Sequence, residues 1–203
     1  MSKAILPPVY LGNVLYYAIW LQHDNIAWAE DHRYPKQTYR NRCDILGANG
    51  MIKCSIPVQK PHGSKSMLSE ITISNAENWP KDHWKSIESA YRSTPFFEHY
   101  APKLYPLLQP QQPLLSEHCK ALHFALCDMM HIKGPEKMTT DLKAATDYSF
   151  YCSPKNKINM SFPPYEQAFF DKLPFAPNCS IIDALMNLGP ETVDYLKEIR
   201  IDI

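Results

Sequence analysis

The chain has 203 residues, enough for one large domain that buries roughly 70% of the surface its unfolded chain exposes. Its 21 basic and 21 acidic residues balance, which excludes a global positive field that could hold nucleic acid or an anionic membrane. The N-terminus has two prolines where a signal peptide needs an unbroken apolar run, and no apolar segment approaches the ~18 residues of a membrane span. We therefore expect a cytoplasmic protein without membrane insertion or a nucleic-acid partner, in which any anion is held locally.

The first third of the sequence predicts strands around one buried helix. Residues 4–6 and 25–30 look like short strands, and residues 13–21 place apolar side chains at the spacing of a buried helix. Asn49-Gly50 then stands between two alternating runs, which is a strong hairpin signal because a type I′ turn needs positive φ at both central residues. A two-residue turn there would pair Cys43 with Ile56 and Ile45 with Cys54.

The basic stretch PKQTYRNRC leads into this hairpin. Period-two alternation puts Arg40 and Arg42 on one strand face, with Lys36 continuing it upstream, and two such arginines about 7 Å apart fit a phosphate or carboxylate held bidentately. The alternative is a solvated strand face with local ion pairs to Asp44. Asn41 falls on the apolar face, where its amide must be hydrogen-bonded, so it either staples the sheet or lines a cavity.

The rest of the chain predicts a mainly helical part that packs on the sheet. Apolar residues recur at helical spacing over residues 79–93, 96–104, 114–132 and 178–199, the last interrupted by Gly189-Pro190. Residues 141–175 are less regular, with strand candidates at 147–152 and 166–170. A strand-rich first third followed by helices predicts one α+β domain over residues 1–203.

The cysteines and histidines are the candidate metal ligands of the sequence. The six cysteines form no C-x-x-C pair and are expected to be buried thiols. Cys119, His123, Cys127 and His131 recur every four residues on one helix, but such a row spans about 18 Å, too far for one ion. Without a second ligand pair we expect packing or surface positions, and neither a metal nor a cofactor.

His83 lies in the first turn of the helix predicted from residue 79. A helix N-terminus lowers the pKa of an imidazole, so His83 could stay neutral and act as a general base; a capping or surface position is the alternative. Trp84, Tyr91 and Arg92 lie on or near the same helix. Aromatic faces beside a guanidinium suit a sugar or nucleotide ring, although Trp84 suits a core equally well.

Four segments of the chain resemble the WbqC-like protein family: YLGNVLYYA, YPKQTYRNRCDILGANG, DHWKSIESAYRSTPFFEHY and PNCSIIDALMNLGPE, which run from residue 10 to residue 191. The resemblance implies a bacterial enzyme of O-antigen or related surface-polysaccharide biosynthesis, with a glycine transferase as the suggested activity. By position it carries over Lys36, Gln37, Tyr39, Asn41, Arg42, His83, Trp84, Tyr91, Arg92, Phe96, Phe97, Asp183 and Asn187. His32 departs from the family, in which a carboxylate is usual at this position. Asp183 also stands three residues after Ser180, at capping-box spacing.

Two functions from different classes follow. The first is a transferase that moves an acyl or aminoacyl group, such as glycyl, to an amino sugar that is phosphorylated or nucleotide-linked. Lys36, Arg40 and Arg42 would grip the phosphate, and His83 would deprotonate the acceptor amine. The other expected binding residues are Asn41, Trp84, Tyr91, Arg92, Asp183 and Asn187. The second function is a non-catalytic module that binds a nucleotide-sugar or a partner of the glycan machinery. A scaffold without a ligand would instead need Arg40 and Arg42 in internal ion pairs.

Overall fold

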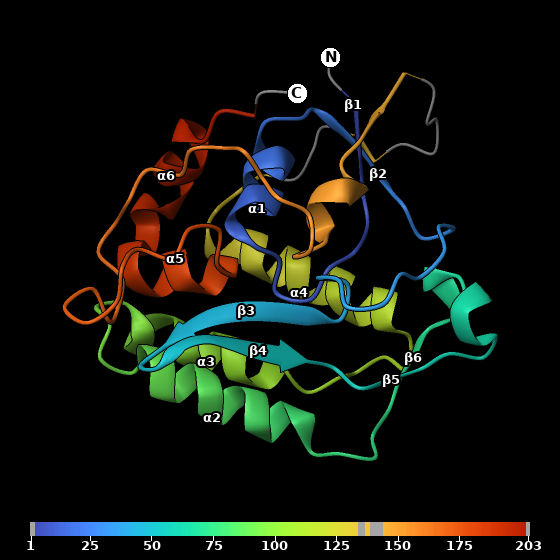
Figure 1. Ribbon diagram of the computed structural model, residues 1–203, viewed down its shortest axis with the longest axis horizontal. Helices are drawn as coiled ribbons and strands as arrows, with labels where there is room; N and C mark the ends of the chain where they lie inside the picture. The colour runs from blue at the N-terminus through green and yellow to red at the C-terminus, as the bar shows by residue number, and fades with distance from the viewer. Residues whose placement is uncertain (1–2, 134–136, 139–143, 202–203) are drawn as a thin grey trace.

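The computed structural model describes residues 3–133, 137–138 and 144–201 (Figure 1). It has an α+β fold, as the sequence predicted, with most strands near the N-terminus and the longer helices after them. Two layers of this fold position the candidate site: a small parallel sheet that contains the first strand, and the β-hairpin.

The parallel sheet has the first strand, β1 (Lys3–Leu6), inside it. Its strand order is β7 (Lys137–Met138), β2 (Asn25–Trp28), β1 and β8 (Thr146–Asp147), with parallel pairing throughout. Helix α1 (Val14–Leu21) connects β1 to β2 as a β-α-β crossover. The sequence predicted both strands and the helix but not their parallel pairing.

Burial on both faces explains why residues 4–6 of β1 are all apolar. Ala4 and Leu6 join the main core, whereas Ile5 packs with Ala27 in a smaller cluster on the opposite face. Parallel strands are commonly covered on both faces and therefore read as continuous apolar runs. Helix α1 follows the same logic, because every residue from Val14 to Trp20 is buried.

The predicted hairpin is present, formed by β3 (Arg42–Gly47) and β4 (Gly50–Ser55). Its predicted register was wrong, because Cys43 lies opposite Cys54 and Gly47 lies opposite Gly50. The two turn residues are therefore Ala48 and Asn49, and Gly50, with φ of 106°, follows them. A shift of two residues leaves each side chain on its predicted face.

The hairpin separates two groups of helices. Its strands contact α2 (Trp79–Tyr91) on one side, and β3 contacts α5 (Ile181–Leu188) on the other. Figure 1 shows α2 below the hairpin and α5 above it. Cys43 and Cys54 are buried, and all six cysteines are buried thiols, as predicted.

The remaining predicted helices are present. They are α3 (Phe97–Leu107), α4 (Leu115–Met129) and α6 (Thr192–Glu198), and two short strands, β5 (Val58–Gln59) and β6 (Thr72–Ile73), pair antiparallel. The strand expected at 166–170 was wrong, since this segment is irregular and ends in a turn. The candidate at 147–152 holds only the end of β8 and then a 3-10 turn, Ser149–Cys152. Residues 141–143 of the irregular region lie outside the described residues.

Gly189, which ends α5, gives a first stability prediction. Its φ is 57°, and a Cβ there would lie 2.5 Å from the ring of Phe96. Gly189→Ala should therefore cost about 2–4 kcal/mol of unfolding free energy, from backbone strain plus overpacking. Gly63 is a matched control, because it has the same φ of 57° but no atom within 4 Å of a built Cβ. Urea denaturation of both variants measures the loss. Equal losses of unfolding free energy in Gly189→Ala and Gly63→Ala would contradict the packing argument.

Candidate functional site

The N-terminal ends of α1 and α5 meet beside β3. Asn13, the N-cap of α1, forms an isolated β-bridge with Ser180, the N-cap of α5. The Ser180 hydroxyl donates to the carbonyl of Leu11 at 2.6 Å, and the Ser180 amide donates to the carbonyl of Asp44 at 2.8 Å. Leu11 and Asn178 have φ of 42° and 55°, so both connecting loops hold a non-glycine residue in the left-handed region. Such backbone persists where the surroundings enforce it, and it occurs often at functional sites.

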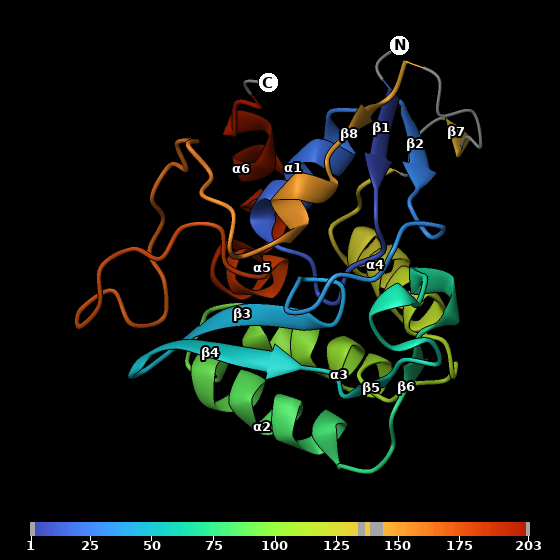
Figure 2. The same cartoon turned by 45° about the vertical axis from the view of Figure 1, so that its right-hand side comes forward.

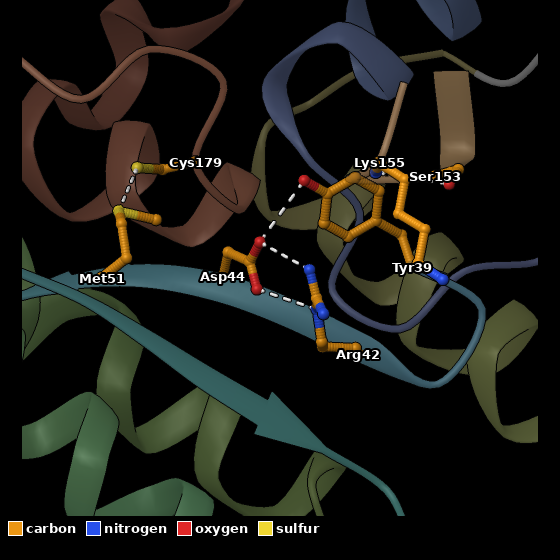
Figure 3. A network of polar contacts seen from close by, with 7 residues as sticks. All are labelled: Tyr39, Arg42, Asp44, Met51, Ser153, Lys155 and Cys179. Carbon is orange, nitrogen blue, oxygen red and sulfur yellow. Dashed lines mark hydrogen bonds and ion pairs between the residues drawn. The ribbon is translucent and has the colours of Figure 1, made fainter. Parts of the chain in front are cut away.

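A polar network lies on β3 at this junction (Figure 3). Arg42 and Asp44 form a two-pronged ion pair, with Nε to Oδ1 at 3.0 Å and Nη2 to Oδ2 at 3.2 Å. The Tyr39 hydroxyl donates to Asp44 Oδ2 at 3.4 Å, and the Arg42 guanidinium lies 5.8 Å from the centre of the Tyr39 ring. Burial and the Asp44 carboxylate raise the pKa of Tyr39 to about 12, so its hydroxyl stays a donor. Arg42 thus makes the ion pair to Asp44 that belonged to the alternative interpretation, although the pair is half-buried rather than solvated.

Asn13 adds a buried amide donor beside this network. Its Oδ1 accepts from the backbone amide of Tyr16 at 2.9 Å and caps α1. Its Nδ2 is buried and has no hydrogen-bond partner among the described residues. The side chain also interacts with the Tyr39 hydroxyl and opposes the rise in the pKa of Tyr39. A buried amide donor needs an acceptor, and an oxygen that enters beside the half-buried ion pair would supply one.

Arg40 does not share a face with Arg42. The strand begins only at Arg42, and Gln37 has φ of 60°, so the period-two pattern does not extend back to residue 40. Arg40 is 3% exposed, whereas Lys36 is exposed in the loop. The shared grip predicted for Lys36, Arg40 and Arg42 is therefore not assembled on one strand face.

Asn41 takes the stapling role that was one of its two alternatives. Its Nδ2 donates to the carbonyl of Ile56 at 2.8 Å, and the Ile56 amide donates to the carbonyl of Asn41 at 2.7 Å. These two bonds extend the hairpin ladder by one step beyond Arg42. The side chain closes the hairpin, and a role in substrate binding stays a prediction.

His83 lies inside an aromatic cluster. It is 6% exposed, and its Nδ1 lies 2.8 Å from the hydroxyl of Tyr10. Its ring also packs against Trp79, and burial lowers its pKa to about 4. It is therefore neutral at pH 7, as predicted, but burial rather than the helix N-terminus is the main cause. Trp84, one residue on, is half-buried and stacks on Phe97. The catalytic role of His83 stays a prediction.

Tyr91, Asp183 and Asn187 come together in a second polar cluster. Asp183 is fully buried and accepts from Tyr91 at 3.0 Å, Tyr165 at 2.6 Å and Gln167 at 2.9 Å. Asn187 donates to the backbone carbonyl of Asp183 at 2.7 Å. Burial raises the pKa of Asp183, and the hydrogen bonds from Tyr165, Gln167 and Tyr91 oppose that rise. Asp183 thus fastens the irregular segment before α5 to two helices.

The predicted site residues therefore lie in separate parts of the molecule. Arg92 is exposed at the end of α2. Sequence reasoning missed Asn13, although an Asn directly before a helix is a readable cap signal. It also missed Tyr165 and Gln167, for which no local pattern gave a signal because they belong to an irregular segment.

The described residues contain neither a metal-binding cluster nor a membrane-spanning helix. Among residues 3–133, 137–138 and 144–201, no group of three or more His, Cys, Asp or Glu side chains is arranged to hold a metal. Cys119, His123 and Cys127 are buried in α4, and His131 is exposed just beyond it. Within the same residues, every helix is too short or too polar to cross a bilayer.

Comparison with known proteins decides the family. Residues 8–153 match the WbqC-like protein family. The chain belongs to this family. It is also similar to the uncharacterized protein Rv1507c of Mycobacterium tuberculosis, at 26% identity over 214 residues that cover 87% of this chain and 89% of the relative. No solved structure matches the chain. The part matched to the WbqC-like family contains Asn13, Tyr39, Arg40, Arg42 and Asp44, whereas Asp183 and Asn187 lie beyond it.

Proposed function

We propose that this WbqC-like protein is a transferase of bacterial surface-polysaccharide biosynthesis, which moves an acyl or aminoacyl group, such as glycyl, to an amino sugar. The observation that carries the proposal is the network of Tyr39, Arg42 and Asp44 beside the buried amide of Asn13. Arg42 and Asp44 are each 14% exposed, so the ion pair is held by the fold yet can be reached by a ligand. The WbqC-like family supplies the link to polysaccharide biosynthesis.

Transfer of an acyl group to an amine requires a hydrogen-bond donor for the carbonyl oxygen and an acceptor for the amine proton, and the network offers both. The acceptor amine attacks the carbonyl carbon of the donor, a C–N bond forms, and the donor's leaving group departs with the bonding electrons. The amine loses a proton, and the carbonyl oxygen gains negative charge in the transition state. We assign the Asn13 amide as the donor to that oxygen and the Asp44 carboxylate as the group that binds the amine and takes its proton.

The assignment of Asp44 replaces His83 as the proposed proton acceptor. His83 is buried and its Nδ1 is engaged by Tyr10, whereas Asp44 lies at the partly exposed network. Because Arg42 contacts both oxygens of Asp44, a substrate amine would compete with Arg42 for one of them. Arg42 then keeps the carboxylate oriented while the proton moves.

Two variants separate the proposed roles of Asp44 and His83. Asp44→Asn should lower turnover by about 100-fold, in the range expected for loss of a general base, whereas His83→Gln should leave turnover within about threefold. Turnover is measured by mass spectrometry of nucleotide-linked amino sugars incubated with glycyl and other acyl thioesters. Circular dichroism and thermal melting confirm that both variants are folded.

The outcomes distinguish the enzyme from its alternatives. Loss of turnover in His83→Gln with an active Asp44→Asn would overturn the assignment and return the base to His83. If the wild-type protein binds amino sugars in calorimetry and Asp44→Asn abolishes that binding, yet no donor is ever consumed, the protein is a recognition module and the transferase proposal is wrong.

A further inference from the structure

Arg40 is a buried cation that forms no ion pair with the described residues. Its side chain is 3% exposed, and its Nε is enclosed and makes no hydrogen bond within residues 3–133, 137–138 and 144–201. No described carboxylate lies within ion-pair distance of it, in contrast to Arg42, which holds Asp44. Burial lowers the pKa of Arg40, but a guanidinium remains charged at neutral pH.

An unpaired buried charge is expensive for a fold. The effective cost of removing an ion from water is several kcal/mol, and pairing or hydrogen bonding normally compensates for it. When a protein retains such a charge without a partner, the missing partner is often a bound molecule of opposite charge. An anion next to Arg40 would supply the compensation that the described residues do not.

The neighbours of Arg40 place it near the carboxyl edge of the parallel sheet. Four ionisable side chains interact with its guanidinium electrostatically: Cys152, Tyr34, Asp147 and Tyr16. Asp147 ends β8, and Tyr16 stands in the first turn of α1, which begins after β1. In Figure 2 the chain between β2 and β3, which carries Arg40, passes below the arrowheads of β1 and β2.

This edge is also where the strand order reverses. The connection from β1 leads through α1 to β2 on one side, whereas β8 lies on the other side of β1. In open parallel sheets, ligands bind outside the carboxyl ends of the strands at such a switch point. The position of Arg40 at this edge therefore supports a ligand site independently of its charge.

The donors available near Arg40 come from side chains. The Tyr16 hydroxyl is enclosed and lacks a hydrogen-bond partner in the described part of the chain, and the same is true of the Ser149 hydroxyl just after β8. The backbone amides at the start of α1 are not available, because those of Val14 and Leu15 already donate to the loop before α5. The Asp147 carboxylate accepts from the Ser149 amide at 2.8 Å and remains a nearby negative charge.

We propose that Arg40 and the Tyr16 hydroxyl bind a phosphoryl group of the ligand at the carboxyl edge of the sheet between β1 and β8. A guanidinium and a hydroxyl that approach from different elements suit the tetrahedral oxygens of phosphate. The inference rests on the proposed function only in treating the phosphoryl group as part of the substrate. The proposed site differs from the phosphate site predicted on the hairpin face, because Arg42 is paired with Asp44 and does not bind the phosphoryl group.

The experiment measures binding of inorganic phosphate and of pyrophosphate by calorimetry and thermal shift. Arg40→Met should weaken binding at least tenfold, and Tyr16→Phe should weaken it severalfold. Arg200→Met is the matched control, since Arg200 is exposed near the C-terminus and should leave binding unchanged. Without phosphate, Arg40→Met should be as stable as the wild type or more stable, because it removes an unpaired buried charge.

Each outcome bears on the proposal. Phosphate affinity unchanged in Arg40→Met would overturn it, and so would acetate binding as tightly as phosphate. A strongly destabilised Arg40→Met would show that the guanidinium has an internal structural role and would also overturn it. Asp44→Asn should retain phosphate binding. A protein that binds phosphate through Arg40 but never transfers an acyl group would keep this inference and reject the proposed function.

Discussion

Lowering the pH from 7 to 5 is expected to remove several kcal/mol of folding stability. Three histidines are buried, with exposed fractions of 6% for His83, 3% for His118 and 1% for His123. Burial lowers the pKa of His83 and His118 to about 4 and that of His123 to about 3, whereas an unfolded chain has a histidine pKa of about 6.5. Each histidine then contributes a loss of about 2 kcal/mol at pH 5.

The sign follows from proton uptake. Between about pH 6.5 and the folded-state pKa, the unfolded chain binds protons at these histidines and the folded chain does not. Their contribution is therefore fully present above pH 6.5 and is lost as the pH falls toward 4. Since many domains are stable by only about 5–15 kcal/mol, the loss from three such groups should bring the protein close to unfolding.

Urea titrations at a series of pH values test this expectation. His123→Phe should flatten the dependence of stability on pH, because phenylalanine keeps the ring that stacks on Tyr17 at 5.2 Å but cannot titrate. His99→Gln is the control and should leave the slope unchanged, since His99 is exposed on α3. A stability that stays constant from pH 7 to pH 5 would show that the buried histidines are protonated without cost.

The second large effect is expected at Asp183. Asp183→Ala should lower the free energy of unfolding by about 3–5 kcal/mol, because it removes a buried acceptor shared by three donors and opens a void. Those donors are Tyr91, Tyr165 and Gln167. Asp183→Asn, which keeps the shape and one oxygen, should lose less.

Limited proteolysis gives a local measurement of the same change. Because Tyr165 and Gln167 belong to the irregular segment before α5, loss of their acceptor should expose residues 153–178 to cleavage before the helices are cut. Asp194→Ala is the control, since Asp194 makes only an exposed ion pair with Lys197 and should cost under about 1 kcal/mol. Equal cleavage rates in Asp183→Ala and Asp194→Ala would rule out the fastening role.

Local patterns were sufficient for the helices and the hairpin but not for the partners of the strands. The helices were readable because their apolar periodicity is set within one or two turns, and the hairpin was readable because Asn49 and Gly50 favour a tight turn. The register of the hairpin depended on which two residues occupy the turn centre. The sequence does not decide between Asn49-Gly50 and the observed Ala48-Asn49. The parallel sheet was not predicted, because strands as short as β1 and β2 carry no information about which other strand they join.

The candidate site was only partly readable for a related reason. Arg42 and its ion-pair alternative were identified because strand alternation holds from residue 42 onward, whereas Arg40 precedes the strand and turns inward. The role of Asp183 as an acceptor could not be predicted, since two of its three donors come from a segment without regular structure. Spatial convergence of this kind depends on the tertiary fold and leaves no local pattern in the sequence.

The position of β1 in its sheet also affects the order in which the protein can fold. Ile5 pairs with Ala27 on one side and with Asp147 on the other, so the two partners are separated by 120 positions along the chain. During synthesis, β1 can pair with β2 early, but its other edge stays open until most of the molecule has emerged from the ribosome. Closing such a distant pair carries a large loop-entropy cost and is slow. An exposed apolar edge during that interval would be a natural binding site for chaperones.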